Sequence, residues 1–231
     1  MMSSIFTSMG RFLDRYPGAR KFFRWLRFQI KKVPGLAKLS IAFDKKYFSY
    51  VGDERPYEEH GTNKDDYFES YARILSKEVH GRVLDLGCGY GYLTERYALN
   101  PEVASVLAID KINDFRRRHL KIEYLSRDLA KEKDLPGKFD VISTSEFIEH
   151  LTEEDFLNLL PRIGGALREG GIYIGSTPRN PTKYKTFSGS RYHLREYNEK
   201  ELTAILERYF RRVKVRPVSD YCMVWEAEGV K

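Results

Sequence analysis

The segment Ser145–Leu151 contains the side chains best suited to acid–base or metal chemistry. Glu146, Glu149 and His150 occupy positions i, i+3 and i+4, so on a helical turn they would share one face. A histidine beside carboxylates can take a proton from a hydroxyl group. The same three side chains could instead bind a divalent cation, with His193 as a fourth ligand, and so lower the pKa of that hydroxyl. A third interpretation is a hydrogen-bonded histidine among solvated carboxylates, without a chemical role.

A glycine-rich segment lies earlier in the chain and predicts a binding crevice. The run Val83–Leu86, which contains Asp85, is typical of a strand buried on both faces. Gly87, Gly89 and Gly91 follow at every second position, where they allow a tight turn and a close approach of the backbone to a ligand. A helical pattern begins soon after, so free N–H groups of a helix N-terminus should face the same crevice.

A second apolar run, Ser105–Ile109, ends in Asp110. A carboxylate at the tip of the neighbouring strand can accept both ribose hydroxyls of a nucleoside that lies across the crevice. The alternative is a solvated carboxylate at a strand end. Asp110 is therefore the candidate ribose ligand.

The spacing of the glycines distinguishes two nucleotide-binding families. In a dinucleotide-binding loop the third glycine follows the second by three residues, but that position here is Tyr92. The pattern Gly-x-Gly-x-Gly after Asp-Leu instead resembles the first motif of class I S-adenosylmethionine (SAM)-dependent methyltransferases. Three further motifs, at Asp110, at Arg127–Leu129 and at Lys138–Ser145, follow in the order of that family.

This resemblance implies SAM as the cofactor and assigns its ligands. An Asp at the position of Asp128 contacts the adenine amino group, and the next backbone N–H, that of Leu129, meets the ring. For Asp128 a helix cap is the alternative. The exit of the fourth strand passes the methionine half of the cofactor. The implied cofactor-binding set is Asp85, Gly87, Cys88, Gly89, Gly91, Asp110, Asp128, Leu129, Thr144 and Ser145.

The Glu-x-x-Glu-His arrangement with a later His resembles two groups of O-methyltransferases. One comprises the ubiquinone-pathway enzymes and bacterial relatives acting on sugars and lipids; the other methylates the 3′-terminal 2′-hydroxyl of small RNAs with a metal held by two Glu and two His. The segment Arg179–Arg191 lacks the longer insertion of the RNA enzymes, which favours the first group. The resemblance implies a small or lipid-linked acceptor, His150 and Glu149 as catalytic residues, and a possible metal at Glu146, Glu149, His150 and His193. A non-catalytic SAM-binding subunit is a further alternative.

The pattern of elements predicts an α/β fold: a Rossmann-like, doubly wound sheet of seven strands over residues 51–231. Most strands should be parallel, and residues 210–218 and 221–229 should form a C-terminal antiparallel hairpin. Helices are expected at 153–167 and after Asn198, a plausible N-cap with Glu201 at the third helical position.

Residues 1–50 form a distinct basic extension, with eleven Lys and Arg against two Asp. Residues 18–32 have helical periodicity with an apolar and a basic face. Such a helix could dock on the catalytic domain, lie in a membrane interface or contact nucleic acid.

No apolar run approaches the length of a membrane span and no signal-peptide pattern is visible. Cys88 and Cys222 make no disulfide framework, so we expect a cytoplasmic protein, with peripheral membrane contact through residues 18–32 as one option.

Overall fold

The computed structural model describes residues 66–182, 185–186, 190 and 192–231. The basic extension, the helix expected at 18–32 and the expected domain boundary at residue 50 lie outside the described residues. Within them, no helix is long and apolar enough to cross a bilayer.

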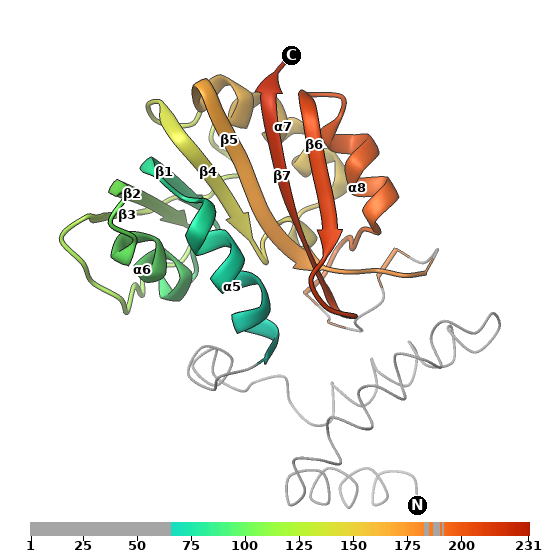
Figure 1. Ribbon diagram of the computed structural model, residues 1–231, viewed down its shortest axis with the longest axis horizontal. Coiled ribbons are helices and arrows are strands. Elements are labelled where there is room, and N and C mark those ends of the chain that lie inside the picture. Colours follow the sequence, from blue (N-terminus) through green and yellow to red (C-terminus); the bar gives the residue numbers. More distant parts are fainter. Residues whose placement is uncertain (1–65, 183–184, 187–189, 191) are drawn as a thin grey trace, which may run out of the picture.

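The described chain forms one sheet of seven strands in the order β3-β2-β1-β4-β5-β7-β6 (Figure 1). The strands β1 to β5 are mutually parallel, and β7 runs antiparallel to both of its neighbours. The bounds are β1 Gly81–Leu86, β2 Val103–Asp110, β3 Ile122–Ser126, β4 Phe139–Ser145, β5 Leu167–Pro178, β6 Phe210–Pro217 and β7 Cys222–Val230. The predicted doubly wound sheet with a C-terminal antiparallel hairpin is confirmed. The strand order reverses between β1 and β4, where ligands bind in open α/β sheets.

Helices cover both faces of this sheet. Residues of α5 (Asp66–Glu78) and α6 (Tyr92–Leu99) share one apolar cluster, and those of α7 (Glu153–Ala166) and α8 (Glu199–Leu206) share the other. The strand β1 contributes Val83 to the first cluster and Leu84 to the second, as expected for a strand buried on both faces. The predicted capping box forms at the start of α8, where Asn198 and Glu201 bond to each other's backbone N–H groups.

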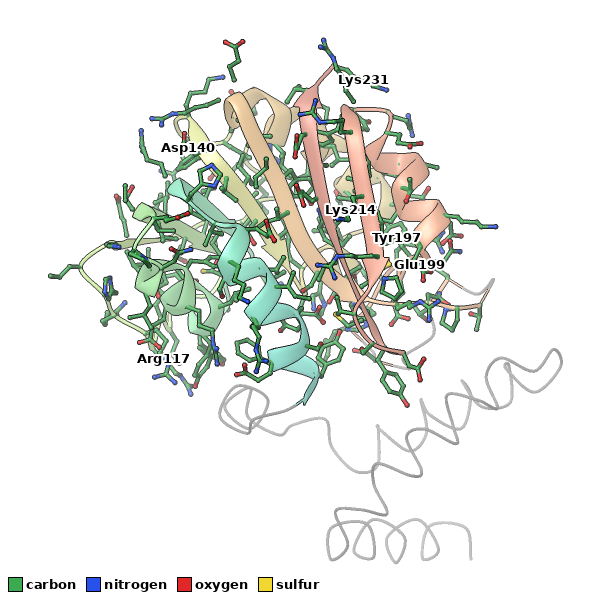
Figure 2. All side chains as sticks on the ribbon, in the orientation of Figure 1. Arg117, Asp140, Tyr197, Glu199, Lys214 and Lys231 are labelled. Atoms are coloured by element: carbon green, nitrogen blue, oxygen red, sulfur yellow. The ribbon has the colours of Figure 1, made fainter. Side chains whose placement is uncertain are left out.

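The connections on either side of β3 contain no helix. Residues 111–121 and 127–138 are built from turns and irregular backbone, although parallel strands are usually joined through a helix. Three successive arginines, Arg116 to Arg118, lie over tyrosines of the glycine turn, the start of α6 and β3. The guanidinium groups of Arg116 and of Arg117, which is labelled in Figure 2, lie 4.2 and 4.4 Å from the ring centroids of Tyr90 and Tyr92. Cation–π contacts therefore take the place of helix packing at this edge.

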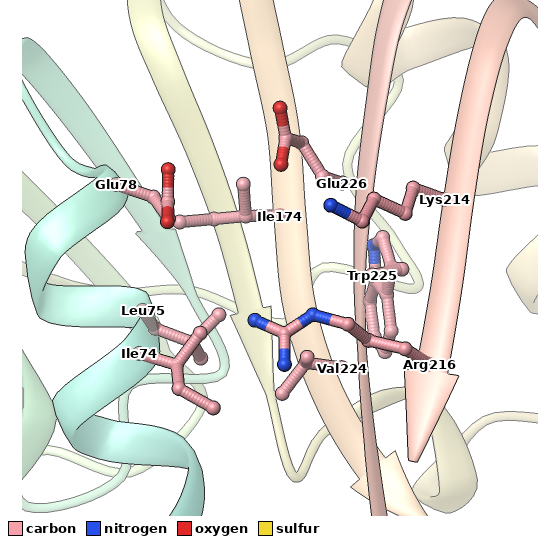
Figure 3. Close-up of a pocket in the computed structure, with 9 residues that line it drawn as sticks. All are labelled: Ile74, Leu75, Glu78, Ile174, Lys214, Arg216, Val224, Trp225 and Glu226. Atoms are coloured by element: carbon pink, nitrogen blue, oxygen red, sulfur yellow. The ribbon is translucent and has the colours of Figure 1, made fainter. Parts of the chain in front are cut away.

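A hollow between α5 and the strands β5 to β7 is not the predicted crevice. Ile174 and Val224 contribute to its apolar floor, and the charged ends of Glu78, Lys214 and Arg216 surround it (Figure 3). None of the predicted site residues lines it.

Candidate active site

The glycine turn adopts the tight conformation that its sequence predicts. Gly87, Gly89 and Gly91 have φ angles of 75, 53 and 89°, which L side chains rarely adopt. A Cβ at Gly87 would lie 2.2 Å from the Phe147 ring, and a Cβ at Gly91 would lie 2.2 Å from the Tyr124 hydroxyl. At these two positions glycine is required by the protein's own side chains, in addition to any ligand.

Asp85 supports this turn from inside the protein. Its side chain is buried, and its carboxylate accepts a 2.6 Å hydrogen bond from the Thr94 hydroxyl of α6. Burial raises the pKa of Asp85 to about 7, and the charge of Asp110 adds to this while the Thr94 hydrogen bond opposes it. Burial also raises the pKa of the Cys88 thiol, so this cysteine is not a reactive thiolate.

Asp110 lies directly against the glycine turn. Its carboxylate accepts hydrogen bonds from the backbone N–H of Gly89 at 2.9 Å and of Ile112 at 3.1 Å. A carboxylate offers about four lone-pair positions, so it can still accept hydrogen bonds from a diol. The structure thus brings together the two motifs that the sequence analysis assigned to one ligand.

Asp128 and Leu129 lie in a turn after β3. The Asp128 carboxylate accepts the Ala130 N–H at 3.2 Å and pairs with the Lys131 ammonium at 3.2 Å. Hydrogen bonds from Lys131 and Ala130 lower the pKa of Asp128. The local capping interaction that we considered as an alternative is therefore present here, although it closes a turn and not a helix. Leu129 is buried and lines a hollow together with Phe147 and with Ala130, Leu151, Asp155, Asn158, Leu159 and Arg162.

Thr144 and Ser145 end β4 but their side chains have different surroundings. The Thr144 hydroxyl is buried and lies 2.7 Å from the Tyr173 hydroxyl. A cofactor contact at Thr144 would therefore use its backbone. The Ser145 hydroxyl lies 2.7 Å from that of Ser176 on β5.

The single helical turn expected from Glu146 to His150 does not form. Glu146 has a φ angle of 50°, the one positive φ of a non-glycine residue among those described, and a short 3-10 helix (η1) covers only Ile148–His150. The reason is tertiary, because the Glu146 carboxylate accepts hydrogen bonds from Tyr67 at 2.5 Å and Ser176 at 2.9 Å. Burial and the charge of Glu149 raise the pKa of Glu146 to about 8.

Three of the four proposed metal ligands come together. One ligand atom from each of Glu149, His150 and His193 lies within 4.8 Å of the other two. Glu149 organises this cluster: its backbone carbonyl accepts hydrogen bonds from the N–H groups of Leu194 and Arg195, which hold the loop carrying His193. Its buried carboxylate accepts the Thr177 hydroxyl at 3.0 Å. Glu146 is not part of the cluster.

Each of the two imidazole rings is oriented by a hydrogen-bond acceptor at its Nδ1 atom. The Nδ1 atom of His150 lies 3.1 Å from the Tyr192 carbonyl oxygen, and Nδ1 of His193 lies 2.6 Å from the buried carboxylate of Glu196. The two rings pack edge to face with centroids 5.1 Å apart.

The two imidazoles differ in basicity. Burial and the charge of His193 lower the pKa of His150. Burial acts in the same direction on His193, but the Glu196 hydrogen bond and the charge of Glu149 outweigh it and raise the pKa of His193. His150 is consequently the imidazole better suited to be neutral and to accept a proton near pH 7.

Several residues of the site were not among the sequence predictions. Glu196 stands three residues after His193, a spacing that could have suggested the pair. Tyr67, Ser176 and Thr177 contribute hydroxyl groups from distant elements, and nothing local in the sequence marks them.

Comparisons with known proteins show the family to which the chain belongs. The family model described as methyltransferase domain matches residues 57–209. The "Probable S-adenosylmethionine-dependent methyltransferase" of Mycolicibacterium smegmatis is 33% identical over 150 residues, covering 59% of this chain and 54% of that protein. The ubiquinone biosynthesis O-methyltransferase of a Bradyrhizobium species is 32% identical over 139 residues, covering 55% and 53%. The chain thus spans about half the length of these curated relatives.

Among solved structures, a DhpI–SAH complex superimposes with a TM-score of 0.61 and 16% identity, over 82% of this chain and 95% of that one. At this identity the likeness shows the fold alone.

Proposed function

We propose that this chain, which belongs to the methyltransferase-domain family, transfers the methyl group of SAM to an oxygen atom of a small or lipid-linked acceptor. The observation that carries this proposal is the cluster of Glu149, His150 and His193 at the carboxyl ends of β4 and β5, beyond the glycine turn. Methylation of a hydroxyl requires the removal of one proton, and this cluster offers the groups for it. A nitrogen acceptor is the less favoured option.

The chain's own residues fit a bound SAM. Asp110 would accept the ribose hydroxyls, and Asp128 and Leu129 would contact the adenine, in the hollow that Phe147 also lines. The backbone of Gly87–Gly91 and the end of β4 at Thr144 and Ser145 would pass the methionine half. The cofactor supplies the methyl group on its sulfonium, so the protein has to align the two reactants in line and remove one proton.

In this proposal His150 is the general base. The Tyr192 carbonyl accepts the Nδ1–H of the neutral ring and leaves Nε2 as the atom that takes the acceptor's hydroxyl proton. The lowered pKa of His150 keeps the ring neutral near pH 7. Glu149 assists by holding the loop of His193 and by stabilising positive charge on the imidazole pair.

A divalent metal at Glu149, His150 and His193 is a second candidate for the same cluster. Two imidazoles and one carboxylate are a common donor set for divalent transition metals. The acceptors at both Nδ1 atoms resemble the outer partners that orient metal-bound histidines. A bound metal would lower the pKa of the acceptor hydroxyl, and His150 could then not serve as base through the same nitrogen. Glu146, the fourth residue of the original set, is left out because Tyr67 and Ser176 hold its carboxylate.

The basic extension would serve the acceptor or a surface. We expect the apolar face of residues 18–32 to dock partly beside the active-site mouth and the basic face to stay free for an anionic acceptor or membrane surface, where each basic residue contributes about 1 kcal/mol. We expect the protein to act in the cytoplasm. An RNA acceptor is the weaker alternative. It would give binding that weakens steeply with salt. A purely SAM-binding subunit is disfavoured, since it would not need the histidine–carboxylate cluster.

The proposal is tested with SAM labelled in its methyl group. The full chain is incubated with catechol-type quinol precursors, nucleotide sugars and short RNAs, and the products are separated by mass spectrometry. Transfer to a hydroxyl oxygen of one of the first two classes is the expected result. Transfer to RNA alone, or to nitrogen alone, would overturn it.

A further inference from the structure

Arg162, on α7, reaches across to the turn that follows β3. Its Nη1 atom donates a 2.9 Å hydrogen bond to the carbonyl oxygen of Leu129. Its Nε and Nη2 atoms are buried and have no hydrogen-bond partner within the described part of the chain. Buried donors without acceptors are destabilising, so stability alone does not account for an arginine at this position.

With the hydrogen bond from Arg162, both polar groups of the Leu129–Ala130 peptide are held in place. The peptide between Leu129 and Ala130 presents its N–H to the Asp128 carboxylate at 3.2 Å and its carbonyl to Arg162. The next N–H, that of Lys131, donates to the Asp128 carbonyl at 2.9 Å. The turn is thus closed on one side by Asp128 and tied on the other side to α7.

The architecture explains why this tie is needed. Residues 127–138, all of which the structure describes, connect β3 to β4 without a helix. No crossover helix therefore packs against the Asp128–Ala130 turn. Leu129 of the turn and Arg162 of α7 line the same hollow, together with Phe147, so α7 faces the turn across this space. A long side chain with a hydrogen-bonding end can span this gap, whereas an apolar side chain could not hold the carbonyl.

We propose that Arg162 is a positioning residue for the cofactor, which holds the Asp128–Ala130 turn in the orientation that recognises adenine. This inference rests on the proposed placement of adenine at Asp128 and Leu129. Arg162 need not touch the cofactor. It acts by limiting the rotation of the Leu129–Ala130 peptide, whose N–H holds the Asp128 carboxylate. The Leu129 N–H lies in the preceding peptide, which the Lys131 N–H fixes through the Asp128 carbonyl, so the two groups would meet the adenine edge together.

The test compares two ligands that differ only at the adenine edge. S-adenosylhomocysteine carries the amino group that Asp128 would accept, whereas S-inosylhomocysteine carries a carbonyl oxygen there, which would face the carboxylate. The dissociation constants of both are measured by calorimetry for the native chain, Arg162→Met and Arg162→Lys. Arg212→Met is the matched control, because Arg212 on the edge strand β6 is exposed and pairs with Glu228 on β7.

The native chain should prefer the adenosyl ligand by about 100-fold, the upper scale of one hydrogen bond to a charged acceptor. Arg162→Met should weaken adenosyl binding by about tenfold while inosyl binding stays nearly the same, so that the ratio of the two dissociation constants falls from about 100 to about ten. Arg162→Lys, which retains one donor, should fall between the two. The control should match the native chain.

An unchanged ratio in Arg162→Met would overturn the role of Arg162, even if the variant were less stable. A native chain that does not distinguish the two ligands would overturn the adenine placement as well. If the two dissociation constants behave as expected but no methyl group is transferred to oxygen, the proposed reaction is wrong and the role of Arg162 stands. If Arg162→Met does not fold, Arg162→Lys decides the question through the same ratio and through faster hydrogen exchange of residues 127–138 than in the control.

Discussion

The Tyr67 hydroxyl donates a 2.5 Å hydrogen bond to the Glu146 carboxylate, which ties the first turn of α5 to the loop after β4. Glu146 has an unfavourable positive φ, and such backbone strain persists only where surrounding contacts enforce it. Here the contacts are the Tyr67 and Ser176 hydroxyls and the bond from the Glu146 N–H to the Ser176 carbonyl. The same loop leads directly into Glu149 and His150, so α5 supports the segment that carries the proposed acceptor site.

Tyr67→Phe should therefore lower the free energy of unfolding by about 1–3 kcal/mol, because it leaves the buried carboxyl group of Glu146 with one hydrogen-bond partner fewer. SAM affinity should stay unchanged, since the Asp110 site is separate. Urea denaturation and calorimetry measure the two quantities. Tyr209→Phe is the control, as that hydroxyl makes only a long 3.4 Å contact with the Leu157 carbonyl. Equal stability of Tyr67→Phe and the native chain would contradict the support role.

Asp110→Ala should weaken SAM binding by roughly 2–3 kcal/mol, because the hydroxyls of a bound ribose would lose their acceptor and the Gly89 N–H would lose its partner. Calorimetry with SAM and S-adenosylhomocysteine is the measurement. Asp114→Ala removes a nearby exposed carboxylate that pairs with Arg116 and should bind normally. Native affinity in Asp110→Ala would remove Asp110 from the site.

Gly91→Ala should destabilise the chain, and Tyr124→Phe should relieve part of the loss. The new Cβ would lie 2.2 Å from the Tyr124 hydroxyl, which has no hydrogen-bond partner among the described residues. Removing that hydroxyl frees space without breaking a bond there. The backbone strain of about 1 kcal/mol would remain. Unfolding of both single variants and the double variant gives the coupling energy, and additive effects would show that the contact is not the cause.

The fold could be predicted from local patterns, whereas the polar network could not. Val83–Leu86 and the glycines after it mark a buried strand and a turn by composition, and Asn198 with Glu201 marks a helix start by spacing. The partners of Glu146 and Glu149 come from α5 and β5, far along the chain, and their hydroxyls belong to residue types that are common everywhere. For the same reason the periodicity of Glu146, Glu149 and His150 indicated a shared helical face, while the tertiary bonds of Glu146 imposed another backbone conformation.

The pH dependence of stability provides a separate test of Asp85. Its pKa of about 7 in the folded chain lies above the usual value of 3.8, so the folded state binds more protons than the unfolded state between these values. Stability contributed by Asp85 is full below about pH 4 and is lost as the pH rises toward 7. Asp85→Asn can still accept the Thr94 hydroxyl but does not titrate. Between pH 5 and pH 8 the native chain should lose about 2–3 kcal/mol more than this variant, as measured by urea denaturation at both values. Parallel pH profiles would contradict the burial of a protonated Asp85.

His150→Ala should lower turnover by about 10²–10⁴-fold while SAM affinity remains nearly intact, the usual scale for the loss of a general base. The residue lies after β4 in η1, on the acceptor side of the glycine turn. His119→Ala is the control, because His119 lies in the connection between β2 and β3.

A chelator distinguishes the general-base form of the proposal from the metal form. Activity that survives chelation favours the base, and activity that is lost and then restored by added Mn²⁺ or Zn²⁺ favours a metal at Glu149, His150 and His193. Normal turnover of His150→Ala on its true acceptor would exclude both forms.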